Sequence, residues 1–329
     1  MRILVAGGTS FVGRAIVRAA VDAGHDITVI NRGVTPSDLP ESVVRLIGNR
    51  DGDLSALSGL SFDTTVDTIA YRPRDVDALA KVLGDRGGHH IQISSISAYE
   101  DPAEEGSTEL TAHLWGEAPT DPDIPINEDT YGPLKAACER SAEQHFGNQL
   151  TIVRPTYVIG SHDATLRFPY WVERIRRGGT IAVPGPRSNA LQYIDARDLG
   201  EFVLKLASNQ TMGAFHVVNP YPASRFFGVI EEIASLIAPA GTELIEVAPS
   251  DVAKFDLGSK FPLWSGAKSL TASAVNPAAA LSVGLKYRAL ESTVADVLAW
   301  WGDRAWPSKW LTPEEELQIL AADGEVHGD

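Results

Sequence analysis

The chain has little cysteine, few basic residues and no long apolar segment, and each shortage excludes a class of protein. Its 329 residues include one cysteine, Cys138, which cannot form an internal disulfide and is typical of a reducing compartment. The 28 Lys and Arg residues are outnumbered by 43 Asp and Glu, so the basic surface that nucleic acid requires is not expected. No apolar run approaches the roughly 20 residues of a membrane span, and no signal-peptide pattern is present. We expect a cytoplasmic protein that binds neither membrane nor nucleic acid.

The first fourteen residues are typical of a strand, a glycine turn and a helix in immediate succession. A short apolar run at residues 3–5 stops at Gly7 and Gly8, and apolar residues then recur at helical spacing from Phe11 onward. Glycines let the backbone approach a pyrophosphate, and a helix N-terminus offers it free N–H groups and partial positive charge. Any tight turn can use glycines, but a second strand at 27–30 lies at the distance that a βαβ unit requires. We interpret the turn as a dinucleotide site.

Strands and helices alternate through the rest of the first half. We expect further strands at 43–47, 65–70, 89–94 and 149–154, a short helix at 53–58, and helices at 73–83 and from Asn127 onward. His89 and His90 are interpreted as a turn pair at the start of their strand. This alternation predicts an α/β fold with a Rossmann-type, doubly wound parallel sheet. Ligands bind such sheets beyond the carboxyl ends of the strands, so Ala70, Tyr71, Ser94 and Ser95 should face the same crevice as the glycine turn.

Two residues after the second strand carry information about the cofactor. NAD-binding folds usually place an acidic residue there for the ribose hydroxyls, whereas this chain has Asn31 and Arg32. An arginine at this place pairs with a 2′-phosphate. We therefore expect NADP(H), with NAD(H) as the alternative if Arg32 is a solvated loop residue.

A candidate catalytic pair lies on the helix that begins near Asn127. Tyr131 and Lys135 are four residues apart, which places both side chains on one helix face. A nearby ammonium stabilises the phenolate of a tyrosine, and the phenol can then exchange a proton with a substrate hydroxyl or carbonyl. Ser95, at the end of its strand, can hold the same oxygen by a hydrogen bond. The polar, Pro-rich segment 100–129, which carries Trp115, is expected to be a loop that covers the crevice.

These features together resemble the extended short-chain dehydrogenase/reductase superfamily of the epimerase/dehydratase type, and its atypical branch in particular. That branch includes bacterial reductases and plastid RNA-binding relatives. The resemblance covers most of the chain and rests on the motifs GGTSFVG at 7–13, ISSISAY at 93–99, YGPLK at 131–135, RPTYVIG at 154–160 and QYIDARDL at 192–199. It implies that Tyr131 is the acid/base, that Lys135 supports its phenolate and contacts the ribose, and that Ser95, four residues before Tyr99, binds the reacting oxygen.

The same resemblance completes the set of expected cofactor contacts. These residues are Gly7, Gly8, Thr9, Ser10, Phe11, Val12, Gly13, Asn31, Arg32, Asn49, Arg50, Ala70, Tyr71, Ser94, Lys135, Pro155 and Tyr157. Two positions depart from the epimerases that act on nucleotide sugars, since Tyr157 stands where they have Asn and Leu191 where they have Arg. The departures argue against a nucleotide-sugar substrate, although Arg167 or Arg187 could compensate.

The second half of the chain is expected to form a smaller mixed α/β substrate lobe. We expect an amphipathic helix at 166–177, a helix at 196–207, a strand at 216–219 and a final helix from Thr312 that frays at Asp323. Residues 1–155 would bind the dinucleotide, with 191–220 returning to that domain. Residues 156–190 and 221–311 would form the substrate lobe, and 312–329 a C-terminal helix and tail. The candidate substrate contacts are Tyr99, His162, Tyr170, Gln192, Tyr193 and Trp264.

Three functions are compatible with these residues. The first is an NAD(P)-dependent oxidoreductase that transfers hydride between the nicotinamide and a secondary alcohol or ketone of a small molecule. The second is an epimerase or dehydratase that works through a keto intermediate with the same residues. The third is a cofactor-binding regulator or RNA-binding protein without turnover. No metal site is expected from the spacing of His, Cys and carboxylate residues, and the resemblance implies a homodimer that pairs through the helices near 73–83 and 131–146.

Overall fold

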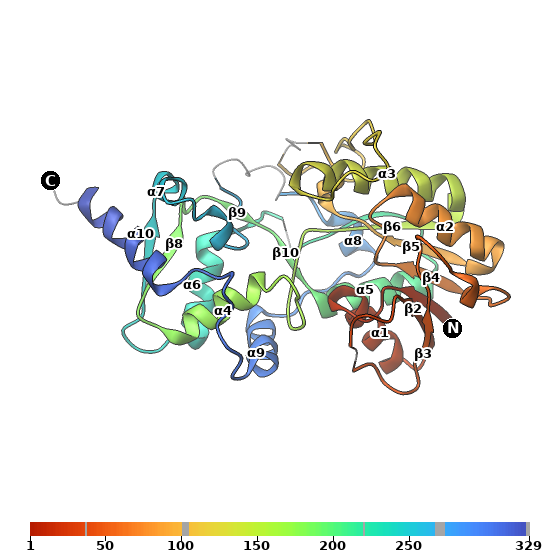
Figure 1. Cartoon of the computed structure of the whole chain (residues 1–329), viewed down its shortest axis with the longest axis horizontal. Coiled ribbons are helices and arrows are strands. Elements are labelled where there is room, and N and C mark those ends of the chain that lie inside the picture. The colour runs from red at the N-terminus through yellow and green to blue at the C-terminus, as the bar shows by residue number, and fades with distance from the viewer. Residues whose placement is uncertain (37, 101–104, 220, 267–273, 327–329) are drawn as a thin grey trace.

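Seven parallel strands form the central sheet, in the order β11-β6-β5-β4-β1-β2-β3 (Figure 1). The computed structural model describes residues 1–36, 38–100, 105–219, 221–266 and 274–326. The strands are β1 (Arg2–Ala6), β2 (Asp26–Asn31), β3 (Val44–Ile47), β4 (Thr64–Asp67), β5 (His89–Ile93), β6 (Leu150–Pro155) and β11 (Gly213–Val217). The predicted Rossmann-type parallel sheet is confirmed.

Alternate residues of the central strands face different helix layers, as a pleated sheet requires. In β1, Ile3 and Val5 pack in the cluster that contains α1 (Phe11–Asp22) and α5 (Ala196–Asn209). Leu4 and Ala6 belong to the cluster on the other face, which contains α2 (Pro73–Leu83). Next to α2 lies α3 (Glu128–Phe146), which carries the candidate catalytic pair (Figure 1). The helices therefore cover both faces of the sheet, and its carboxyl edge stays open for a ligand.

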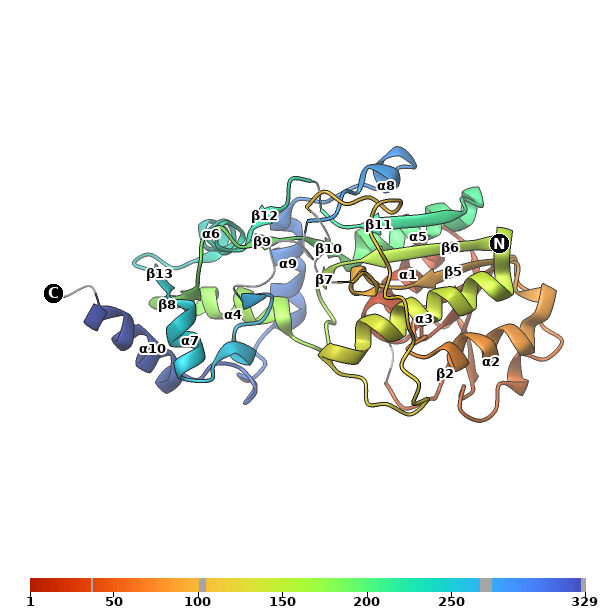
Figure 2. The same cartoon turned by 90° about the horizontal axis from the view of Figure 1, so that it is seen from above.

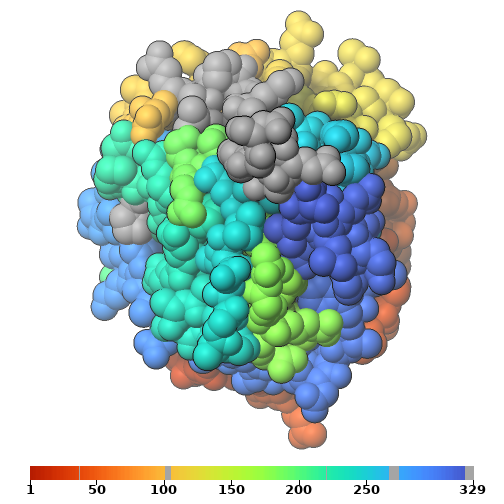
Figure 3. Space-filling model, turned by 90° about the vertical axis from the view of Figure 1, so that its left-hand side faces the viewer, coloured from red at the N-terminus to blue at the C-terminus, as the bar shows by residue number. Residues whose placement is uncertain are grey.

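The C-terminal part of the chain forms a lobe with its own core beyond one end of the sheet, and Figures 1 and 2 agree on this placement. Its helices are α4 (Arg167–Arg177), α6 (Phe226–Ile237), α7 (Pro249–Lys254), α9 (Leu290–Trp301) and α10 (Pro313–Val326). The short α8 (Ala278–Ser282) instead packs near β11. The remaining strands are β7 (Tyr157–Ile159), β8 (Thr180–Pro184), β9 (Ala190–Leu191), β10 (Tyr193–Asp195), β12 (Ser224–Arg225) and β13 (Glu243–Val247), which pair as β7–β10, β8–β13 and β9–β12. Figure 3 views this end, where segments from the middle and the end of the chain form one surface.

Several elements differ from the expected bounds. The strand expected at 65–70 ends at Asp67, and the one expected at 216–219 is β11, Gly213–Val217. The expected helix at 53–58 is a single 3-10 turn, Ser55–Leu57. The helix α10 continues past Asp323 to Val326, so the expectation that the chain frays from Asp323 is wrong for residues 323–326. Residues 327–329 lie outside the described residues. No helix in the described ranges is long and apolar enough to cross a membrane.

The interpretation of His89 and His90 as a turn pair is wrong, because both lie within β5 and are buried. Nε2 of His89 contacts Oγ1 of Thr151 at 2.7 Å. The ring of His90 stacks on Phe146 with 3.8 Å between centroids. Burial lowers the pKa of each imidazole to about 4, because the charged form loses its hydration.

These two histidines predict an acid-sensitive fold. Between pH 6.5 and about 4 the unfolded chain binds protons that the buried imidazoles do not, so the free energy of unfolding should decrease as the pH falls through this range. Urea denaturation across the range measures the slope. His90→Gln should make the slope shallower, whereas His113→Gln, which alters an exposed imidazole, should leave it unchanged. Equal slopes in the two variants would refute this assignment.

Candidate active site

The turn between β1 and α1 is built so tightly that two of its positions require glycine. Gly7 has φ +90°, a left-handed conformation that side chains disfavour. A Cβ atom on Gly13 would lie 2.3 Å from the carbonyl oxygen of Gly7. Ser10 occupies the N-cap position of α1, and its side chain makes no capping hydrogen bond. The backbone of this turn can therefore approach a ligand closely, and the first N–H groups of α1 are not satisfied by the cap side chain.

A groove of about 430 Å³ opens from this turn along the carboxyl edge of the sheet. Eight of the expected cofactor contacts line it: Gly7, Thr9, Ser10, Asn31, Arg32, Asn49, Arg50 and Tyr71. Other expected cofactor contacts do not line the groove: Ala70 and Ser94 are buried, and Gly8 and Gly13 pack beneath the turn. Phe11 lines a separate hollow of about 600 Å³ beside α1 and α5. Sequence reasoning missed several residues that line the groove, among them Thr35, Arg72, Arg74 and Ile126. Each of them lies several residues along the chain beyond the end of the preceding strand.

Four arginines line this groove, and their partners differ. Arg50 is committed to the protein, because it donates to the buried Asp67 carboxylate at 2.6 Å and to the carbonyl oxygen of Asp75 at 2.8 Å. Arg72 donates to the carbonyl oxygens of Pro122 and Ile124, and Arg74 pairs with Asp51 and Asp123. Arg32 is exposed and has no hydrogen bond or ion pair within the described ranges. Its guanidinium is therefore the one in the groove that is free to bind an anion.

The start of α3 sets the position of the candidate catalytic pair. The Asn127 side chain accepts hydrogen bonds from the backbone N–H groups of Asp129 and Thr130 and so caps the helix. Tyr131 and Lys135 then follow one turn apart. The Lys135 ammonium is buried and donates to the carbonyl oxygens of Ala70 at 3.0 Å and Ile93 at 2.7 Å. An ammonium has three donors, so one remains for a ligand.

The hydroxyl of Tyr131 is half-buried and has no hydrogen-bond partner in the described part of the chain. Its ring lies 6.5 Å from the Tyr71 ring, and the Lys135 ammonium lies 5.6 Å from the centroid of the same Tyr71 ring. Tyr71 therefore contacts both members of the pair from the groove side. Burial raises the pKa of the Tyr71 phenol against the opposing effect of Lys135, so Tyr71 is neutral.

Gly132, which sequence reasoning did not use, brings this helix against the segment that carries Ser95. A Cβ atom on Gly132 would lie 2.3 Å from the carbonyl oxygen of Ser97. Ser95 caps the short turn η3 (Ile96–Ala98), where its hydroxyl accepts from the Ser97 N–H at 3.1 Å and donates to the Ser97 hydroxyl at 3.2 Å. A glycine inside a helix, beside a candidate catalytic tyrosine, is the signal that could have predicted this contact.

A second cavity of about 1300 Å³ adjoins the groove and contains Tyr131. Of the expected residues, Tyr99, Tyr157 and Trp264 also line it. Sequence reasoning missed most of the remaining lining, which includes Ser97, Glu100, Trp115, Ile126, Glu128, Asp129, Ser259, Ser265 and Val275. Ile126 lines both spaces, so this cavity, hereafter the cleft, lies next to the groove. Trp115 comes from the 100–129 segment, and of that segment residues 101–104 lie outside the described ranges.

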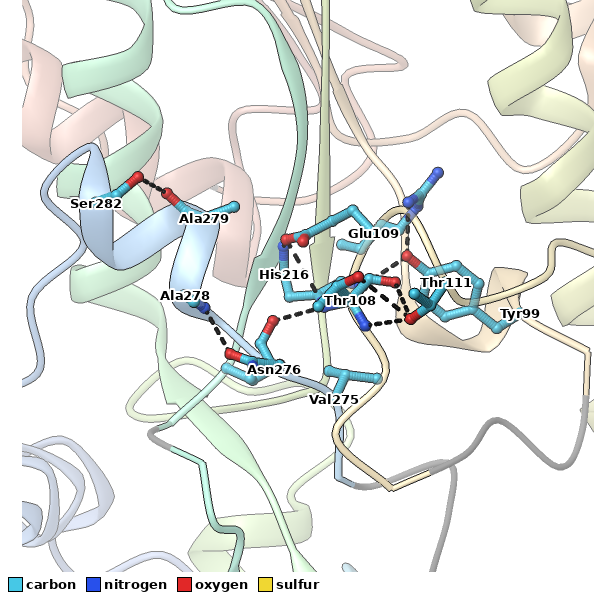
Figure 4. A network of polar contacts seen from close by, with 12 residues as sticks. Tyr99, Thr108, Glu109, Thr111, His216, Val275, Asn276, Ala278, Ala279 and Ser282 are labelled. Atoms are coloured by element: carbon cyan, nitrogen blue, oxygen red, sulfur yellow. Dashed lines mark hydrogen bonds and ion pairs between the residues drawn. The ribbon is translucent and has the colours of Figure 1, made fainter.

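The hydroxyl of Tyr99 is occupied by a buried polar network (Figure 4). Arg154 donates to it at 2.6 Å, and it lies 2.6 Å from Nε2 of His216. Nδ1 of His216 is 3.0 Å from the carbonyl oxygen of Asn276, which can only accept, so the ring proton is on Nδ1 and Tyr99 donates to Nε2. The backbone N–H of His216 donates to Glu109. Tyr99 therefore offers the cleft its ring and not its hydroxyl.

Four expected substrate contacts do not line the cleft. Gln192 is buried and bonds the backbone N–H and carbonyl of Val275 with its amide, so it supports the wall from behind. Tyr170 is fully buried in the lobe core among tryptophans. His162 lines the hollow beside α1, and Tyr193 is half-buried in β10 outside the cleft lining. No group of three or more His, Cys, Asp or Glu residues in the described ranges could hold a metal ion.

Comparisons with known proteins agree with this arrangement. The sequence profile of the NAD dependent epimerase/dehydratase family matches residues 3–60 and 54–219. The chloroplast stem-loop binding protein of 41 kDa b from Arabidopsis thaliana is 24% identical over 281 residues, which are 79% of this chain and 68% of that protein. A 2-alkyl-3-oxoalkanoate reductase from Stenotrophomonas maltophilia is 29% identical over 221 residues, 62% of this chain and 64% of the reductase, so the match spans just under two thirds of that relative.

Solved structures extend the similarity to nearly the whole fold. A UDP-glucose 4-epimerase superposes on 94% of this chain with a TM-score of 0.68, and all of that structure is covered, at 16% sequence identity. At this identity the likeness concerns the fold. It accounts for both the parallel sheet and the smaller lobe beyond its edge.

Proposed function

This chain belongs to the NAD dependent epimerase/dehydratase family, and we propose that it is an oxidoreductase that acts on a secondary alcohol or ketone of a small molecule. One observation carries the proposal. The hydroxyl of Tyr131 is free of partners within the described ranges and faces the cleft, one helical turn before the buried Lys135 ammonium. That arrangement supports Tyr131 as the proton donor and Lys135 as the cation beside it.

The groove fits an NADP(H) molecule. The backbone of the Gly7–Gly13 turn would hold the pyrophosphate, since glycine at both ends allows so tight a turn: a Cβ on Gly7 would collide with the Ile69 side chain and one on Gly13 with the Gly7 carbonyl. Arg32 would bind the 2′-phosphate, and the remaining donor of Lys135 would bind the ribose next to the nicotinamide. When bound, the nicotinamide supplies or accepts the hydride.

The protein's own part in the reaction is to hold the substrate oxygen and move one proton. Tyr131 would donate a proton to a ketone oxygen or accept one from an alcohol, and the Lys135 ammonium would lie one helical turn from it, held by the carbonyls of Ala70 and Ile93. The Ser95 hydroxyl would rotate from Ser97 to hold the same oxygen. Loss of NADPH absorbance with a panel of ketones, and NADP reduction with the matching alcohols, tests the activity. If the protein binds neither NADPH nor NADH, the proposal fails.

The proposed preference for NADP(H) predicts an asymmetric effect at Arg32. Arg32→Ala should weaken NADPH binding by about 10- to 100-fold, because a charge-assisted contact contributes about 1.5–3 kcal/mol, and should leave NADH binding nearly unchanged. Titration of each nucleotide by fluorescence measures this. Lys81→Ala, which removes an exposed cation on α2 outside the groove, is the matched control. Equal losses for both nucleotides would contradict the assignment.

Two other functions remain to be separated by experiment. Epimerisation or dehydration through a keto intermediate would use the same Ser95, Tyr131 and Lys135, and product analysis of enzyme supplied with catalytic amounts of cofactor distinguishes it from net oxidation. The Arabidopsis relative is named a stem-loop binding protein, and this name favours nucleic-acid binding as the other function. Titration with a labelled RNA stem-loop tests that alternative, which the net charge of −15 disfavours.

We propose a homodimer that pairs through α2 and α3, and sedimentation at working concentration tests it. A cytoplasmic location is proposed on the single cysteine and the absence of an apolar span in the sequence.

A further inference from the structure

We propose that the substrate is an uncharged molecule with a ring or other planar apolar part, and that the cleft rejects phosphorylated and carboxylated compounds, nucleotide sugars included. The inference rests on the proposed function and names its substrate class. It is carried by the charge and the chemistry of the cleft walls.

The cleft has no cation in its described lining. None of its lining residues is Lys, Arg or His, whereas three of them are the exposed carboxylates Glu100, Glu128 and Asp129. None of the three side chains has a hydrogen bond or ion pair within the described ranges. No cationic partner among the described residues therefore offsets these carboxylates, and an entering anion would be repelled rather than bound.

The two arginines that were expected to compensate do not line the cleft. Arg187 pairs with Glu231 and Glu246, and its guanidinium lies 3.6 Å from the centroid of the Phe227 ring. Arg167 donates to the Thr165 hydroxyl and lies 5.2 Å from the centroid of the Tyr157 ring. Arg167 therefore contacts a ring that lines the cleft but does not itself line it.

Three backbone N–H groups at the start of α3, those of Asp129, Thr130 and Tyr131, are not available to an anion. The N-terminus of α3 faces the cleft, but the Asn127 side chain accepts from the N–H groups of Asp129 at 3.0 Å and Thr130 at 3.1 Å. The Tyr131 N–H is bonded to the Asn127 carbonyl at 2.9 Å. A phosphate at this helix end would meet two carboxylates, from Glu128 and Asp129, and no free donor among these three amides.

The walls instead offer aromatic surface. Tyr99, Trp115, Tyr157 and Trp264 line the cleft together with Tyr131. The polar groups of two of these rings are already used, since the Tyr99 hydroxyl is held by Arg154 and His216 and the Trp264 N–H donates to the carbonyl of Gly185 at 2.9 Å. Rings in this state contact a ligand through their apolar parts, which suits a planar or cyclic carbonyl compound.

The test compares matched ligands and a charge-reversed cleft. Wild-type enzyme with saturating NADPH should show kcat/KM at least about tenfold higher for a neutral cyclic or aryl ketone than for the same scaffold bearing a carboxylate or phosphate. UDP-glucose should not bind the NADP-bound protein in calorimetry. The double variant Glu100→Lys/Glu128→Lys should raise UDP-glucose affinity and kcat/KM for the anionic ketones by about tenfold, which corresponds to about 1.4 kcal/mol.

A double variant at two exposed carboxylates outside the cleft, Asp85→Lys/Glu143→Lys, changes the net charge equally and should leave both quantities unchanged. Binding or turnover of UDP-glucose by the wild type would overturn the inference while leaving the oxidoreductase intact. If no ketone or alcohol reacts, the proposed function fails, and the UDP-glucose titration of the wild-type and charge-reversed proteins still decides the charge of the ligand.

Discussion

Tyr131→Phe should lower kcat by about 10²- to 10⁴-fold, the typical contribution of a positioned general acid or base, and should leave the affinity for NADPH nearly unchanged. The reason is geometric. Within the described residues the Tyr131 hydroxyl bonds to nothing, so its removal deletes a proton donor without breaking a structural contact. The helix cap at Asn127 and the Lys135 contacts to the carbonyls of Ala70 and Ile93 stay intact.

Steady-state kinetics with a substrate found in the ketone panel measures this effect, and nucleotide titration measures binding. Tyr221→Phe is the matched control, because it removes a hydroxyl from a tyrosine that is 40% exposed and lies outside the groove and cleft linings. Unchanged turnover in Tyr131→Phe would exclude this residue as the acid/base and would direct attention to Tyr71, the neighbouring phenol.

Arg154→Met should decrease the free energy of unfolding by about 3–5 kcal/mol, as expected when one partner of a buried ion pair is removed. Both side chains of the Arg154–Glu139 pair are buried and meet in a bidentate arrangement, with distances of 2.9 and 2.5 Å. Burial alone would lower the pKa of Arg154, but the Glu139 carboxylate raises it above its ordinary value, so the guanidinium stays charged. Without it, the Glu139 carboxylate and the Tyr99 hydroxyl both lose a donor.

Urea denaturation measures the cost, and two variants locate its origin. The double variant Glu139→Leu/Arg154→Met should be more stable than Arg154→Met, because no unpaired buried charge remains. Arg2→Met breaks the exposed Arg2–Asp63 pair and should cost less than about 1 kcal/mol. A double variant no more stable than the single one would show that the pair does not determine the loss. The wall of the cleft should also change, because Arg154 would no longer donate a hydrogen bond to the Tyr99 hydroxyl.

Elements with strong local signals could be predicted from sequence to within a residue or two. The helix expected at 73–83 is α2, Pro73–Leu83, where proline at the first turn sets the start. Asn127 caps α3 as its side chain suggested. Short buried strands were harder. The segment 65–70 is rich in β-branched residues throughout most of its length, but only the residues that pair with β1 and β5 belong to β4, and that pairing is a tertiary fact.

The site divides in the same way. The glycine turn, Arg32 and Tyr131 were expected from local sequence patterns, and they line one groove and its adjoining cleft. Lys135 is buried one helical turn after Tyr131. Several of the expected substrate contacts do not line the cleft. Gln192 and Tyr170 are polar enough to bind a ligand, yet one holds the Val275 backbone and the other packs in the lobe core. Composition does not reveal which partner a buried polar group finds.

The sequence by itself determined the parallel sheet, the nucleotide turn and the spacing of Tyr131 and Lys135, because each depends on residues that are neighbours along the chain. Only the tertiary structure decided which charges remain free. Arg50 is neutralised by Asp67 and Arg187 by Glu231 and Glu246, whereas Arg32 in the groove and Glu128 in the cleft have no partner within the described ranges. The charge that a ligand meets depends on such pairings between distant segments, and these form only when the chain has folded.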